Sequence, residues 1–187
     1  RFYKDNRWGK FWSVGGNWRV SKEAFMEDVE WVNNLSVKVS YGQQGNDDLG
    51  SFYAWQSLYD LSWSNSAQIG GMVSTLENKK VTWEKNNNFN VGIEASLFDS
   101  RLSINAEYYN KKTTEMFLGY PMATSTGFNG YNANVGDMRN SGFEFEIKGT
   151  PIKTNDFTWN ISWMGSTVKN KVLKLTAESP EIISGIN

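Results

Sequence analysis

The sequence predicts an all-β fold, an antiparallel transmembrane β-barrel segment of about six strands that is part of a larger barrel. Six stretches alternate apolar and polar residues with a period of two, which is typical of strands whose two faces meet different surroundings. The joins between these stretches alternate short and long, as in outer-membrane barrels, where short turns face the periplasm and long loops face outside.

The predicted strands follow one another at residues 10–21, 34–43, 81–97, 101–117, 137–149 and 157–173. In the first strand, Trp12, Val14 and Trp18 share a face. The acidic join after it carries apolar residues at a spacing that predicts a helical turn or two beginning after Ser21. Residues 44–80, which follow the second strand, are rich in Gly, Asn and Ser and are predicted to form a long loop.

The third and fourth strands are predicted to pair through a tight turn. With Asp99 and Ser100 as the central turn residues, Leu97 faces Leu102, and apolar residues also meet at every second position further along the hairpin. Asp-Ser is a weaker turn signal than Asn-Gly, so the matching parity of the faces supports the pairing more strongly than the turn type does.

The remaining joins repeat the pattern. Residues 118–136, with Pro121 and several Gly and Asn, are predicted to form a second long loop. Residues 150–156 form a short join with Pro151 and the turn-forming pair Asn155-Asp156. The tail at residues 176–187 is predicted to begin a third long loop.

Charge separates the two faces of the predicted strands. The apolar stripes carry no charge, and the opposite stripes carry Arg19, Lys38, Glu94, Glu107, Glu144, Glu146 and Lys148. The strands are also longer than the roughly five or six residues usual in soluble sheets. These features favour a membrane barrel. A soluble carbohydrate-binding β-sandwich, in which the same apolar stripe would face the protein core, stays open as an alternative.

Composition excludes several kinds of chemistry. The chain has no Cys and no His, so it has neither thiolate metal ligands nor the commonest general base, and we expect no metal and no cofactor. Its net charge of −1 predicts no binding of nucleic acid. Aromatic residues make up 15% of the chain although its mean hydropathy is −0.55, and a barrel with one apolar face per strand reconciles these values. The chain begins with Arg1, and we expect it to be a piece of something longer.

Five segments resemble one known family. They are RWGKFWSVG at residues 7–15 with the following WRVS, WVNNLSVKVSYGQQGN at 31–46, LENKKVTWEKNNNFNVG at 76–92, YYNKKT at 108–113 and NSGFE at 140–144. In this order they are similar to signatures of the SusC-like TonB-dependent transporters. Asn78 is followed by Lys79 rather than by the Pro sometimes seen there.

The resemblance implies a fold and a function. Residues 1–187 are expected to belong to one barrel domain, the later part of a plugged barrel of about 22 strands. The plug, the TonB box and the other strands are expected to lie outside this chain. The implied function is active import of oligosaccharides or peptides across the outer membrane of Bacteroidetes-type Gram-negative bacteria. The implied partners are a SusD-like surface lipoprotein that acts as a lid, TonB through the plug, and outer-membrane lipid.

The candidate contacts to cargo or lid are aromatic residues of the long loops, since Tyr and Trp combine a flat apolar body with a polar group. They are Trp55, Tyr59, Trp63, Tyr120, Phe128 and Tyr131. Packing of the loops against one another is the alternative role. No enzymatic activity is expected, although an outer-membrane enzyme barrel stays open as an alternative.

Two further groups of acidic residues could form a catalytic pair or a calcium site, and we favour a purely structural role for both. Glu144 and Glu146 lie on one strand face as a glycosidase pair would, and polar lining of the barrel lumen explains them as well. Asp47 and Asp48 with Asn46 resemble a fragment of a calcium loop, and a solvated loop explains them better.

Overall fold

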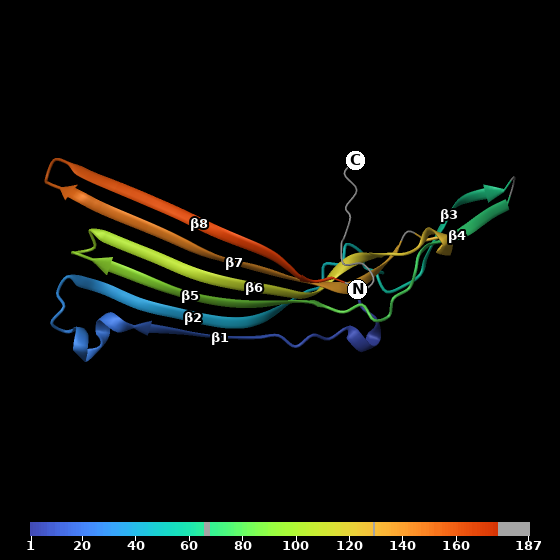
Figure 1. Cartoon of the computed structure of the whole chain (residues 1–187), viewed down its shortest axis with the longest axis horizontal. Coiled ribbons are helices and arrows are strands. Elements are labelled where there is room, and N and C mark those ends of the chain that lie inside the picture. The colour runs from blue at the N-terminus through green and yellow to red at the C-terminus, as the bar shows by residue number, and fades with distance from the viewer. Residues whose placement is uncertain (66–67, 129, 176–187) are drawn as a thin grey trace.

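The computed structural model describes residues 1–65, 68–128 and 130–175. Its main feature is a six-stranded antiparallel sheet in the order β1-β2-β5-β6-β7-β8. These strands span Trp12–Arg19, Val32–Asn46, Glu84–Leu97, Leu102–Pro121, Gly130–Lys153 and Thr158–Lys174. A two-stranded sheet of β3 (Leu58–Asn65) and β4 (Gln68–Thr75) lies beyond one end of the large sheet (Figure 1). The six predicted strands are thus confirmed.

Four short 3-10 helices complete the described elements: η1 (Lys4–Asn6), η2 (Val20–Lys22), η3 (Ala24–Met26) and η4 (Thr124–Thr126). The helical turns expected after Ser21 are therefore present as η2 and η3, just after β1. None of the helices in the described ranges is long and apolar enough to cross a membrane.

The register places each apolar stripe beside the next. Ala95 faces Ile104 and Ile104 faces Ile147, so aliphatic side chains form a continuous row across β5, β6 and β7. One position along, Glu94 faces Asn105 and Asn105 faces Glu146, so that row is polar. We call the face with Ile104 the outer face and the face with Asn105 the inner face. The predicted pairing of Leu97 with Leu102 is confirmed, along with three further pairs of the same hairpin.

The turn between β5 and β6 has positive φ at Phe98, Asp99 and Ser100. Two central residues in this region are what a type I′ turn requires, and the Arg101 N–H donates to the Phe98 carbonyl oxygen at 3.1 Å. The preceding join supports the turn. The Phe98 ring stacks on Trp31 with 5.7 Å between ring centroids, and Asn33 Oδ1 accepts from the Ser100 N–H at 2.9 Å.

Nothing in the described chain covers the outer face. Trp18 is 54% exposed, Ile93 48% and Trp163 62%. The small buried core lies instead near the loop end of the sheet, where Phe2, Leu49, Ala54 and Val81 pack together. A β-sandwich would bury these stripes under a second sheet, so this fold is not the sandwich alternative. The sheet is a wall whose apolar side needs an external apolar phase.

Two predicted loops were partly wrong. Residues 118–136 were expected to be a loop, but β6 continues to Pro121 and β7 begins at Gly130. Residues 44–80 were also expected to be a loop, and they contain the β3–β4 hairpin. The join at residues 150–156 is shorter than expected because β7 runs to Lys153, with a register irregularity that accommodates Pro151. The tail expected at residues 176–187 lies outside the described residues.

The two four-residue turns lie at one end of the sheet together with the join that holds η2 and η3, and the other two connections lie at the opposite end (Figure 1). Residues 20–31, 98–101 and 154–157 connect strands at the first end, which we call the turn end. Residues 47–83 and 122–129 connect strands at the second end, which we call the loop end. The alternation expected from the sequence is confirmed.

Candidate binding surfaces at the loop end

The β3–β4 hairpin exposes most of its large apolar side chains. Tyr59 is 63% exposed and Trp63 55%, and Ile69 on the opposite strand is 83% exposed. An isolated two-stranded hairpin is only marginally stable in water, and exposed aromatic residues on it add apolar surface without a partner. The hairpin extends away from the sheet (Figure 1), so these side chains are presented to whatever lies beyond the loop end.

An Asx-type contact shapes β3 between its two aromatic candidates. The Ser62 N–H donates to Asp60 Oδ1 at 2.9 Å, at the register irregularity between Asp60 and Trp63. Hydrogen bonds from the Ser62 backbone and side chain lower the pKa of the Asp60 carboxyl from its usual value. An Asp carboxyl is already ionised at neutral pH, and the lowered pKa keeps this acceptor ionised to more acidic pH.

The other four aromatic candidates have packing partners or lie apart from the hairpin. Trp55 is half-buried and lies 5.4 Å from Tyr3 between ring centroids. Tyr120 and Tyr131 face each other across β6 and β7 with their ring centroids 5.3 Å apart. Phe128 is half-buried in the 122–129 connection. The structure thus separates the hairpin pair Tyr59 and Trp63 from residues that stabilise the loops themselves.

Sequence analysis missed a polar clamp that holds the base of the loops. Asn134 on β7 accepts from the Thr82 N–H at 2.9 Å and donates to the Thr82 carbonyl oxygen at 2.9 Å and to the Glu115 carbonyl oxygen at 2.7 Å. Glu84 accepts from the Phe117 N–H and from the Asn46 side chain, both at 2.7 Å. The one feature of the sequence that pointed to this clamp is that Glu84 lies in the segment at residues 76–92 that resembles the SusC-like family.

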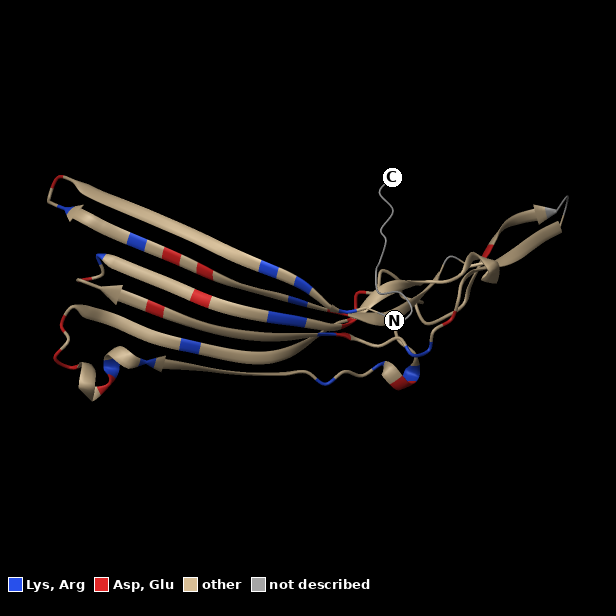
Figure 2. Cartoon of the chain, in the orientation of Figure 1, with Lys and Arg blue, Asp and Glu red and all other residues tan. Residues whose placement is uncertain are grey.

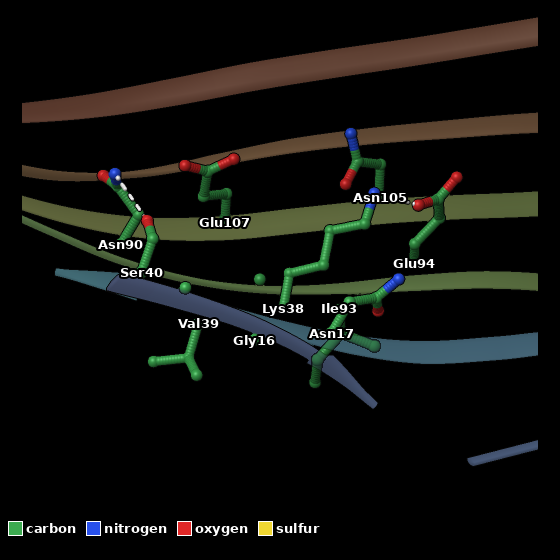
Figure 3. Close-up of a pocket in the computed structure, with 12 residues that line it drawn as sticks. Gly16, Asn17, Lys38, Val39, Ser40, Asn90, Ile93, Glu94, Asn105 and Glu107 are labelled. Atoms are coloured by element: carbon green, nitrogen blue, oxygen red, sulfur yellow. Dashed lines mark hydrogen bonds and ion pairs between the residues drawn. The ribbon is translucent and has the colours of Figure 1, made fainter. Parts of the chain in front are cut away.

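The inner face forms a shallow hollow of about 520 Å³ over β1, β2, β5 and β6 (Figure 3). Lys38 and Glu94 form an ion pair in it, and Asn90 donates to the Ser40 hydroxyl at 3.3 Å. Glu107 extends into the same space and faces Glu144 across the β6–β7 pair. Polar and charged groups of both signs on an open surface bind water and solutes, and no nucleophile with an adjacent base is present among the described side chains of this hollow.

The two groups of acidic residues that could form a catalytic pair or a calcium site each include a carboxylate with a basic partner in the structure. Glu146 pairs with Lys148 at 2.8 Å, as a lining residue does. Asp47 pairs with Arg1 at 3.2 Å, and Asn46 is held by Glu84. Within residues 1–65, 68–128 and 130–175, no group of three acidic side chains is placed to hold a metal ion.

These features define a class of protein: a curved antiparallel wall with an uncovered apolar outer face, a polar inner face, tight turns at one end and long loops at the other. That is the wall of a transmembrane β-barrel. The family profile described as "TonB dependent receptor-like, beta-barrel" matches residues 1–179. The chain belongs to this family, whose members are β-barrels of Gram-negative outer membranes.

Named relatives agree with this assignment. The TonB-dependent receptor P26 of Formosa agariphila is 32% identical over 176 residues, which cover 93% of this chain and 18% of that protein. The TonB-dependent receptor SusC of Bacteroides thetaiotaomicron is 31% identical and covers 94% of this chain. A solved structure of the RagAB peptide transporter superposes with a TM-score of 0.87 at 32% identity, covering 95% of this chain and 19% of that one. The chain thus spans less than a fifth of the length of these relatives, and it is part of a larger barrel.

Proposed function

We propose that this chain is part of the wall of a SusC-like, TonB-dependent importer that takes up peptides or oligosaccharides across the outer membrane. Residues 1–187 form part of a single barrel domain in this proposal, and the plug that engages TonB lies outside them. The RagAB peptide transporter, 32% identical to this chain, supports peptide as cargo. Oligosaccharide is kept as the second cargo class because the sequence motifs resemble those of SusC-like transporters, and SusC itself is 31% identical.

The observation that carries the proposal is the exposed β3–β4 hairpin at the loop end. Tyr59 and Trp63 are rigid aromatic anchors that bury large areas on binding and lose little side-chain entropy. We infer that they contact a SusD-like lipoprotein lid or the cargo held beneath it. The inner face has the passive role of a polar lumen, and this segment carries out no chemistry.

The experiment is made in the full-length protein with its lid. The double variant Tyr59→Ser/Trp63→Ser is expected to leave barrel assembly intact and to reduce either lid co-purification or uptake of a fluorescent cargo by about tenfold or more, as loss of two aromatic anchors does. Loss of lid co-purification would assign the hairpin to the lid, and loss of uptake with the lid retained would assign it to cargo. Deletion of residues 58–75 is expected to act in the same way.

Phe25→Ser is the matched control, because Phe25 is an equally exposed aromatic at the turn end, where neither lid nor cargo binds. It is expected to leave both readouts unchanged. Dissipation of the proton-motive force is expected to abolish uptake in the wild type. Wild-type uptake and lid binding in the hairpin variants would refute the role of the hairpin, and uptake without the proton-motive force would refute TonB-dependent import.

A further inference from the structure

We propose that the outer face of β6, β7 and β8 binds the phosphate groups of lipopolysaccharide, the anionic lipid of the outer leaflet, at the loop-end edge of the apolar band. The binding surface is a basic patch formed by Lys112, Arg139, Lys169 and Lys171. The inference rests on the outer-membrane setting described above, and it is independent of the cargo, the lid and TonB.

The register shows that the basic patch belongs to the outer face. Tyr108 faces Phe143 across β6 and β7, and both continue the outer apolar stripe. Two positions further toward the loop end, Ser141 faces Lys169. Two positions beyond that, Arg139 faces Lys112 on one side and Lys171 on the other. No register irregularity intervenes over these positions, so the alternation of faces is continuous from the apolar band into the basic patch.

This result corrects the expectation that the apolar stripes carry no charge along the strands. The stripes are uncharged within the apolar band, but on β6, β7 and β8 they become basic beyond it. In Figure 2 the Lys and Arg positions of β6 and β8 lie toward the loop end, whereas β7 has one there and two more, Lys148 and Lys153, nearer the turn end. At the turn end, by contrast, the paired residues of the outer face include the apolar side chains of Leu97, Leu102 and Ile161. The outer face is therefore electrostatically asymmetric.

The basic patch has little compensating charge. Lys112 lies 3.6 Å from Asp137, whose carboxylate also accepts from the Glu115 N–H. Arg139, Lys169 and Lys171 form no ion pair within the part of the chain that the structure describes. Like charges directly opposite each other destabilise a sheet, and Lys112, Arg139 and Lys171 form such a row. An external anion removes this repulsion.

Continuity with the apolar band identifies the anion. Tyr108 is 39% exposed and Phe143 is 44% exposed directly below the patch. The ligand must cover these two rings with hydrocarbon. It must also place negative charge against the cations of the basic patch, which lie two to four residues further along the strands. An amphiphile with phosphate groups meets both demands, and Arg is well suited to bidentate contact with phosphate. The loop end faces outside, where the outer leaflet supplies such a lipid.

The test uses the purified full-length barrel in detergent and, as probe, lipid A with its phosphates. Arg139→Gln/Lys171→Gln is expected to weaken binding of this probe by about tenfold or more, because each cation near an anionic lipid surface contributes to attraction. Binding is measured by native mass spectrometry and by the shift of the melting temperature. Lipid A from which the phosphates have been removed is expected to bind the wild type as weakly as phosphorylated lipid A binds the variant.

The matched control is Lys111→Gln/Lys148→Gln, which removes the same charge from the inner face. Lys111 faces Asn140, one residue away from the basic patch but on the other side of the wall. This control is expected to bind phosphorylated lipid A like the wild type. Equal weakening in both double variants, or equal binding of both forms of lipid A, would overturn the proposal. Import activity is not part of this readout, so a barrel that binds the phosphorylated probe but imports nothing would refute only the proposed function.

Discussion

Asn134 uses both polar atoms of its side chain to fix two irregular stretches of backbone. Its amide holds both backbone groups of Thr82 and the carbonyl of Glu115, a residue with φ of 56°. Asn134→Asp keeps the acceptor but replaces the donor with an oxygen that faces two carbonyl oxygens. We expect a local destabilisation of about 1–3 kcal/mol, the cost of leaving such groups unpaired. Hydrogen exchange at the Thr82 amide, which should accelerate, measures it.

The matched control is Asn132→Asp. Asn132 takes part in the same region only through its backbone carbonyl, which accepts from the Asn78 side chain at 2.8 Å. The control is therefore expected to leave exchange at Thr82 near the wild-type rate, and a slow amide in the Asn134 variant would show that the clamp does not hold this segment. The clamp could not be predicted from the sequence, because Thr82 lies outside the strands and 52 residues from Asn134, and the register of β6 and β7 near Glu115 is irregular.

Among the elements, the β5–β6 hairpin offers a direct test of turn strain. Ser100 has φ of 61°, a region that costs a residue with a side chain roughly 1–2 kcal/mol. Ser100→Gly removes this cost but also the hydrogen bond from the Ser96 hydroxyl at 3.1 Å, so we expect a net stabilisation of about 0.5–1 kcal/mol. Ser100→Val, which is β-branched, should destabilise the hairpin instead. Urea unfolding of the full-length barrel in lipid vesicles measures both changes, and equal midpoints would contradict the assigned strain.

The elements also show why part of the fold was predictable. Within the apolar band one face meets lipid and the other meets polar surroundings, so alternation is strong and the pairing of Leu97 with Leu102 followed from it. Beyond the apolar band both faces of the strands meet water. At the ends of β6 and β7 the sequence therefore lacks the alternation of apolar and polar residues on which the strand prediction depended. Tyr120 faces Tyr131 there, and Gly119 faces Asn132.

The β3–β4 hairpin was overlooked for a different reason. Tyr59, Leu61 and Trp63 do alternate with polar residues, and this signal would have identified β3. The second strand contains the pair Gly70-Gly71, which weakens strand propensity, and the surrounding Gly- and Ser-rich composition is typical of a loop. The six aromatic candidates were correctly assigned to the loop end, but only contacts such as Tyr3 with Trp55 separate packing residues from exposed ones.

At the scale of the whole molecule, the six-stranded sheet cannot be stable in a membrane without further strands at its edges. The outer edges of β1 and β8 have no strand partner among the described residues, and unpaired backbone groups at an edge are costly in hydrocarbon. Further strands must close the barrel, consistent with coverage of only 19% of the RagAB chain. The same closure turns the polar face inward and the apolar face toward lipid, so the two faces must respond differently to charge.

Adjacent substitutions test this difference. Ile104→Lys places a cation between Ala95 and Ile147 on the outer face, and we expect it to destabilise the full-length barrel by roughly 2–4 kcal/mol in lipid. Asn105→Lys introduces the same charge between Glu94 and Glu146 on the inner face, so we expect little loss or a small gain. Urea unfolding in lipid vesicles measures both. Since the variants differ by one position and carry the same charge, equal destabilisation would mean that hydrocarbon does not cover the Ile104 face, and the membrane assignment of this wall would be wrong.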